Sequence, residues 1–170
     1  MKKLVLFSIS LLLIASCASM ASGPRASATL APTSGSTASG TVGLAQMADG
    51  SVEFTIKLMG VPPGVHGFHI HDKGDCGDNG NAAGGHFNPA ATAHGAPSAE
   101  PHHAGDFGNV TADASGNVNT HFNTRSVTLD GGASSAAGHA IILHANPDDL
   151  MTQPTGNAGA RIACGVVQMK

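Results

Sequence analysis

The feature that most constrains the fold of this sequence is residues 72–105, a long segment with no hydrophobic periodicity. It is rich in Gly, Ala, Asn, Asp and Pro. A loop of this length is uncommon in a compact domain unless something other than secondary structure orders it. Seven of the ten histidines lie between residues 66 and 103. Because neutral imidazole is a frequent ligand of zinc and copper, we expect metal binding to order this segment.

Four side chains of the ligand type are spaced along this segment and just beyond it. They are His86, His94, His103 and Asp106, separated by 8, 9 and 3 residues. This spacing is sufficient for one loop to wrap a tetrahedral site with three nitrogen ligands and one oxygen ligand.

Outside this loop, alternation of apolar and polar residues indicates β-strands. The clearest case is residues 51–58, SVEFTIKL, where every second side chain is apolar. Asp49-Gly50 before it predicts a hairpin with residues 41–47.

Residues 65–71 are also expected to form a strand. Phe68 and Ile70 then face the core, so His69 and His71 lie together on the outer face, a spacing that can chelate one metal ion. His66 falls on the core face, where we expect a hydrogen-bonded structural histidine.

The C-terminal third continues the strand pattern. We expect residues 108–111 and 118–122 to form a hairpin, residues 138–145 a buried strand, and residues 160–169 an alternating strand. His121 has no ligand-type neighbour and is expected at the surface. The sequence therefore predicts an all-β fold, an eight-stranded antiparallel barrel or sandwich with Greek-key connections and long loops. The 23 Gly, the 9 Pro and the charged fraction of only 11% agree with short strands and many turns.

Residues 1–16, MKKLVLFSISLLLIAS, have the pattern of a secretory signal, two lysines followed by an apolar run too short to span a bilayer. The run ends at Cys17 and resembles a bacterial lipobox, which predicts lipidation of Cys17. The alternative is an ordinary signal peptide cleaved after Ala21. Residues 17–26 are small and polar, as expected for a flexible tether, and residues 27–170 would form the folded domain.

Export would place the chain in an oxidising compartment, where Cys76 and Cys164 can pair and Cys17 is left over. In the chain-entropy model, a cross-link closing a loop of this length stabilises the fold by about 4–5 kcal/mol. Without Lys2 and Lys3, basic residues number 6 against 11 acidic ones, a net charge of −5. This balance argues against a nucleic-acid partner.

Several motifs occur in an order that resembles the copper/zinc superoxide dismutases, in particular their exported bacterial branch. They are HGFHIH, GGHFNP, HHAGDFGNVTAD, ILHANPDDL and GNAGARIACGVV, and the resemblance extends from Ser27 to Lys170. It implies a Greek-key β-barrel with metal-binding and active-site loops, copper and zinc as cofactors, and a disulfide between Cys76 and Cys164.

The resemblance also implies a role for individual residues. The copper ligands would be His69, His71, His86 and His144, and the zinc ligands His86, His94, His103 and Asp106. His86 would bridge the two metals, since an imidazole loses its second proton near neutral pH only between two cations. Arg161 would be the active-site arginine beside copper, and Asp148 a carboxylate that joins His69 to His94.

The implied activity is dismutation of superoxide to dioxygen and hydrogen peroxide by copper that cycles between Cu(II) and Cu(I). The implied setting is antioxidant defence in the periplasm or cell envelope, with a lipid anchor at Cys17; a monomer and a homodimer are both compatible with the resemblance. One alternative is a non-catalytic periplasmic copper- and zinc-binding protein, which would be expected to lack a copper ligand or the arginine. Another is a zinc hydrolase, which would need a general base beside the metal; neither Glu53 nor Glu100 is suitably placed.

Overall fold

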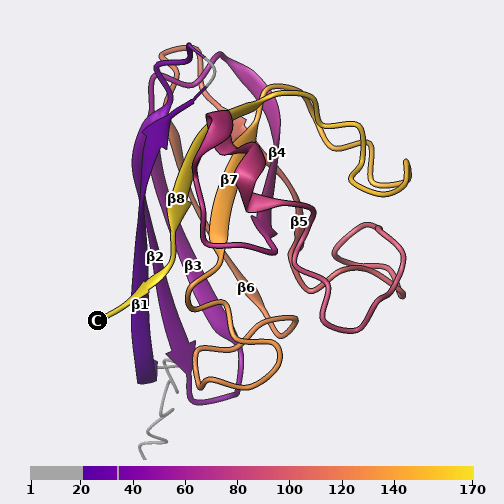
Figure 1. The fold of residues 1–170 in the computed structure, drawn as a ribbon. Coiled ribbons are helices and arrows are strands. Elements are labelled where there is room, and N and C mark those ends of the chain that lie inside the picture. Colours follow the sequence, from indigo (N-terminus) through magenta and orange to yellow (C-terminus); the bar gives the residue numbers. More distant parts are fainter. Residues whose placement is uncertain (1–20, 34) are drawn as a thin grey trace, which may run out of the picture.

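The computed structural model describes residues 21–33 and 35–170. Eight antiparallel strands form a nearly closed barrel (Figure 1), in the order β5-β4-β7-β8-β1-β2-β3-β6, which confirms the predicted fold class. The strands are β1 (Ala21–Pro32), β2 (Ser39–Met47), β3 (Val52–Met59), β4 (Gly64–His71), β5 (Asp106–Ala112), β6 (Val118–Thr124), β7 (Ala140–His144) and β8 (Arg161–Val166). A two-residue strand, β9 (Gln168–Met169), pairs with β1, and a short 3-10 segment, η1 (Asp78–Ala83), interrupts the first long loop.

The hairpin of β2 and β3 forms as predicted. The two strands pair from Ser39 opposite Met59 to Gln46 opposite Val52. Along β3, burial alternates residue by residue, and Val52, Phe54 and Ile56 are fully buried. The period of two in the sequence therefore reports a strand with one face in the core.

The other half of the barrel supplies the site. β4 pairs with β7, and β7 pairs with β8. All five residues of β7 are buried, and so are the last six of β4, because these strands are covered on both faces. Ala83 of η1 packs against Ala140 and Ile142 of β7 and Cys164 of β8, and Ile70 of β4 exchanges backbone hydrogen bonds with Phe87 and Gly105 of the same loop. His69 and His71 are thus on the outer face of the barrel, as predicted, but beneath a loop and with no exposed surface.

The predicted hairpin of residues 108–111 and 118–122 is wrong in its pairing. Both segments are strands, and the turn between them closes as expected, with the Gly116 amide donating to the Asp113 carbonyl. However, β5 pairs with β4 and β6 pairs with β3, so these two strands form the open seam of the barrel. The rings of Phe107 and Phe122 lie 5.3 Å apart, centre to centre, and each packs 4.9 Å from Phe54. These rings pack against the core, and a cavity of about 1040 Å³ lined by residues of both strands lies along the seam.

The N-terminal part of the domain starts earlier than expected. Residues 21–26, assigned above to a flexible tether, belong to β1, where Arg25 pairs with Ala45 and Ala26 with Leu44. Residues with small side chains can pair with β2 through their backbone groups, but they give no hydrophobic pattern in the sequence. The signal segment 1–16 and the lipidation site Cys17 lie outside the described residues. Within the described part, no helix is both long and apolar enough to cross a membrane.

Candidate metal centre

Two groups of buried ligand atoms lie side by side on the β4–β7 face. The first consists of His69, His71, His86 and His144, and the second of His86, His94, His103 and Asp106; within each group all ligand atoms are within 4.8 Å of one another. His69 and His71 come from β4 and His144 from the end of β7, while the loop of residues 72–105 contributes the other three histidines. Each group has four members because His86 belongs to both.

Backbone carbonyls fix the orientation of two imidazoles in the first group. Nδ1 of His71 donates to the Gly84 carbonyl over 2.9 Å, and Nδ1 of His144 donates to the Gly159 carbonyl over 3.3 Å. Since neutral imidazole carries one proton, Nε2 of each ring is left with a free lone pair. Both lone pairs are available to a cation in this group.

The second group is centred on one carboxylate oxygen. Oδ1 of Asp106 lies 2.6 Å from Nδ1 of His86, 3.1 Å from Nδ1 of His94 and 3.2 Å from Nδ1 of His103. The other oxygen, Oδ2, accepts the backbone amides of Gly95 and His103. The carboxylate is thereby fixed with one oxygen among three ring nitrogens.

These residues fit divalent metal ions. Four buried ring nitrogens in the two groups have no hydrogen-bond partner: Nδ1 of His69, Nε2 of His86, Nδ1 of His94 and Nδ1 of His103. Buried polar atoms without a partner are unfavourable and are rarely clustered unless they bind something. Three imidazoles and one carboxylate suit zinc, and four imidazoles suit copper.

A single carboxylate joins the two groups. Oδ2 of Asp148 accepts from Nε2 of His69 over 2.8 Å, and Oδ1 accepts from Nε2 of His94 over 3.0 Å. Both imidazoles therefore direct a bare Nδ1 toward their respective groups. Asn109 holds the main chain of Asp148, because its amide donates to the Asp148 carbonyl over 2.9 Å and accepts the Asp148 amide over 2.7 Å. This arrangement is the one that the family resemblance implies for Asp148.

The protonation states of the ligands suit cation binding. Burial, followed by the charge of neighbouring imidazoles, lowers the pKa of His69 and His71 well below the usual histidine value. Burial also lowers the pKa of His144 to about 4 and that of His103 by a smaller amount. Although burial alone would raise the pKa of Asp106, hydrogen bonds from His86 and from two backbone amides hold it below its usual range. At neutral pH the rings of His69, His71, His103 and His144 are therefore neutral and the Asp106 carboxylate is charged, as metal ligation requires.

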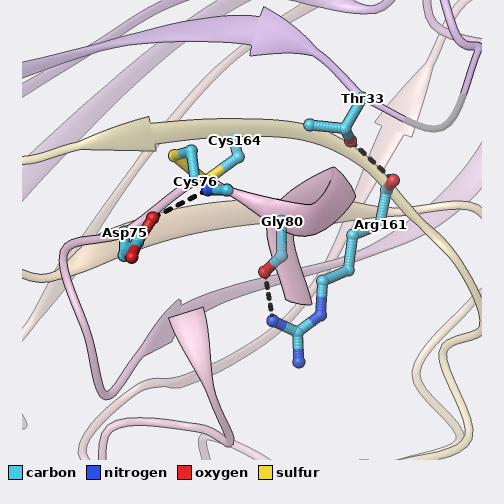
Figure 2. Close-up of a disulfide and its surroundings, with 7 residues drawn as sticks. Thr33, Asp75, Cys76, Gly80, Arg161 and Cys164 are labelled. Atoms are coloured by element: carbon cyan, nitrogen blue, oxygen red, sulfur yellow. Dashed lines mark hydrogen bonds between the residues drawn. A yellow bond between two sulfur atoms is a disulfide. The ribbon is translucent and has the colours of Figure 1, made fainter. Parts of the chain in front are cut away.

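Arg161 lies at the start of β8, beside the first group. It lines a cavity of about 330 Å³ together with His71 and His144. Figure 2 shows its side chain extending to the carbonyl of Gly80, near the disulfide of Cys76 and Cys164. Its second terminal nitrogen donates to the Gly84 carbonyl, which also accepts from His71. No carboxylate pairs with this guanidinium in the described residues, so its charge faces the cavity unneutralised.

His66 and His121 lie outside both groups, as expected, and so does His102. His66 is buried, and its two ring nitrogens contact the carbonyls of His144 and Pro62, which makes it a structural residue. Nδ1 of His102 donates to the His103 carbonyl, and His121 is exposed on β6. Sequence reasoning missed the groups that hold the ligands and Asp148 in place by hydrogen bonds. These are the carbonyls of Gly84 and Gly159 and the side-chain amides of Asn109 and Gln153.

Comparison with known protein families matches residues 38–167 to the family described as copper/zinc superoxide dismutase (SODC). The chain belongs to this family. A solved structure described as that of the clock protein EA4 is similar, with 38% sequence identity and a TM-score of 0.77 over 85% of this chain and 93% of the other. The structure thus brings together the residues of both metal groups that the resemblance implies, with His86 in each group, and joins Cys76 to Cys164.

Proposed function

We propose that this protein dismutes superoxide to dioxygen and hydrogen peroxide. The observation that carries the proposal is that His86 belongs to two four-residue ligand groups, one of which shares a cavity with Arg161, an arginine that pairs with no carboxylate in the described part of the chain. A protein that only stores metal needs neither a shared ligand nor an anion-binding charge beside it. The family membership supports the same reaction.

The two groups would hold different metals. His69, His71, His86 and His144 would hold copper, and His86, His94, His103 and Asp106 would hold zinc. When bound, copper would supply the one-electron redox chemistry that dismutation needs, and zinc, which has none, would polarise the shared imidazole.

Arg161 would bind the substrate. Superoxide is a small anion, and Arg161 carries the only fixed charge among the residues that line the cavity. The carbonyls of Gly80 and Gly84 hold the guanidinium in place before substrate arrives, so little reorganisation accompanies binding. Where water is scarce, this charge attracts an anion more strongly than it would in bulk solvent.

His86 would handle a proton. Its Nδ1 is held 2.6 Å from Oδ1 of Asp106, whereas its Nε2 is buried and has no hydrogen-bond partner in the structure. Nε2 is therefore the atom that can take up a proton and release it to the reduced product, which becomes hydrogen peroxide by taking its second proton from water.

The site of action that we propose is the cell envelope, where the protein would remove superoxide while attached through a lipid on Cys17. Supporting this are the signal-like residues 1–16 and the disulfide, which forms in oxidising compartments. A Cys17→Ser variant should then appear in the soluble fraction of fractionated cells, whereas the unaltered protein should appear with membranes.

The test of the activity is metal analysis and a superoxide-consumption assay on the purified protein and on three variants. His69→Ala should lose copper and activity together. Arg161→Ala should retain both metals and turn over more slowly. His121→Ala, an exposed histidine outside both groups, is the control and should match the unaltered protein. A fully loaded protein that does not consume superoxide would instead identify a non-catalytic metal-binding protein on the same fold.

A further inference from the structure

The side chain of Gln153 forms two hydrogen bonds with the main chain of His94. Its Oε1 accepts the His94 amide over 2.9 Å, and its Nε2 donates to the His94 carbonyl over 2.8 Å. These bonds define the orientation of the amide group, since the opposite orientation would place donor against donor and acceptor against acceptor. The two hydrogen bonds resemble those that join residues directly opposite each other on adjacent antiparallel strands.

His94 is consequently held from two directions by one loop. Gln153 fixes its backbone, and Asp148 fixes its ring through Nε2. Both residues lie in the segment between β7 and β8, while His94 lies in the loop between β4 and β5. The two loops therefore meet at His94.

The segment that carries Gln153 is braced internally. Asp149 accepts the backbone amides of Met151 and Thr152 on Oδ1 and the Thr152 hydroxyl on Oδ2. The Asp149 amide donates to the Gly156 carbonyl, and the Gly156 amide donates to the Thr152 carbonyl. Because this turn is closed by its own hydrogen bonds, Gln153 is presented to His94 from a rigid support.

We propose that Gln153 is a positioning residue for the second ligand group, acting through His94. Nδ1 of His94 must stand 3.1 Å from Oδ1 of Asp106 for the group to converge, and the ring can do so only if its backbone is fixed. The two hydrogen bonds of Gln153 act on the second group alone, because His94 does not belong to the first one. The inference rests on the proposed function only in its premise that the second group binds a divalent cation.

The test uses Gln153→Met, which keeps the length of the side chain and removes both hydrogen bonds. Gln153 is exposed, so the substitution leaves the core intact. Zinc affinity is measured on the copper-free protein by competition with a chromophoric chelator, and cobalt is added in place of zinc to record its visible ligand-field absorption. Loss of an outer partner of a metal ligand usually weakens binding 10–100-fold, so we expect zinc affinity to fall about ten-fold and the cobalt bands to change.

Gln46→Met is the matched control. The Gln46 amide also bridges backbone groups, accepting the Leu129 amide and donating to the Gly50 carbonyl, but it lies away from both ligand groups. This variant should unfold at a lower temperature and keep the zinc affinity and cobalt spectrum of the unaltered protein. Gln153→Asn, whose shorter side chain cannot reach both backbone groups, should behave like Gln153→Met.

Unchanged zinc affinity and cobalt bands in Gln153→Met would overturn the proposal, as would equal losses in Gln153→Met and Gln46→Met. Since no step of this experiment involves copper or superoxide, its result is independent of the dismutase assay. If zinc affinity depends on Gln153 but the protein does not consume superoxide, the proposed function is refuted and this inference stands.

Discussion

His71 and His144 face each other with their Nε2 atoms 3.3 Å apart. Backbone carbonyls hold the proton of each ring on Nδ1, so two lone pairs point toward one another. This contact is repulsive unless a cation lies close to both atoms. A proton cannot be that cation at neutral pH, because burial lowers the pKa of His144 to about 4 and that of His71 well below the usual value. The geometry is therefore one that a metal ion stabilises.

The lowered pKa values of these buried rings predict that the metal-free protein loses stability in mild acid. Between about pH 6.5 and pH 4, the unfolded chain protonates His144 while the folded chain does not, so each fall in pH favours unfolding. Each histidine of this kind contributes about 1.4 kcal/mol per pH unit within its window. His69 and His71 add to the effect because their pKa values are also lowered in the folded state.

Thermal unfolding of chelator-treated protein from pH 7.5 to 4 measures this loss. We expect the midpoint to fall steadily below about pH 6.5, where unfolded histidine begins to titrate. His144→Gln, which cannot be protonated, should show a shallower decline than the unaltered protein, whereas His121→Gln should show the same decline. A midpoint that stays constant down to pH 5 would contradict the prediction.

Asp148→Asn should weaken zinc binding by about 10–100-fold, the usual cost of losing an outer partner of a metal ligand. The carboxylate accepts from both His69 and His94, whereas a carboxamide offers one acceptor and would set its NH₂ group against the other ring. Asp113→Asn is the control, since the Asp113 carboxylate accepts the amides of Ser115 and Asn117 in the turn before β6 and contacts neither imidazole. Chelator competition on the two variants checks the difference; equal affinities would exclude the proposed role of Asp148.

The parts of this fold that could be predicted from sequence are those governed by local pattern. Alternation in residues 51–58 predicts β3 because one face of that strand is buried residue by residue. The ligands His86, His94, His103 and Asp106 could be predicted because an otherwise unordered loop carries them at workable spacing. Assignment of His144, Asp148 and Arg161 to the site required the family resemblance, since nothing in the local pattern distinguishes them.

Long-range contacts could not be predicted in this way. Gln153 and His94 are 59 residues apart, and Asn109 and Asp148 are 39 apart, so their hydrogen bonds exist only once the barrel has brought the loops together. The same limit explains why the pairing predicted for residues 108–111 and 118–122 is wrong. A turn sequence predicts that the chain reverses but not which strands pair, and here β5 pairs with β4 while β6 pairs with β3.

Removal of the disulfide should impair both stability and substrate binding. Cys164 is three residues from Arg161 on β8, and the Cys76 carbonyl accepts the amide of Gly80, whose own carbonyl holds Arg161. Cys76→Ala with Cys164→Ala should destabilise the protein by about 4–5 kcal/mol in the chain-entropy model and reduce turnover at unchanged metal content. In an Arg161→Ala background the double substitution should lower the rate no further. A further drop in that background would show that the disulfide acts on the site by another route.

The electrostatic attraction of substrate should depend only weakly on salt. Arg161 is the one fixed charge lining the cavity, the segment between His144 and Arg161 contains no lysine, and the chain without Lys2 and Lys3 has a net charge of −5. Attraction then acts over the short distance from Arg161 into the cavity, within the Debye length of about 10 Å at 0.1 M salt, and is little screened. Asn81→Lys adds a cation at the exposed rim and should raise kcat/KM at low salt while making it fall steeply as salt is added. We would compare kcat/KM of the two proteins from about 0.01 to 0.2 M ionic strength. If kcat/KM of the unaltered protein falls as steeply as that of Asn81→Lys, charges beyond the cavity guide the substrate.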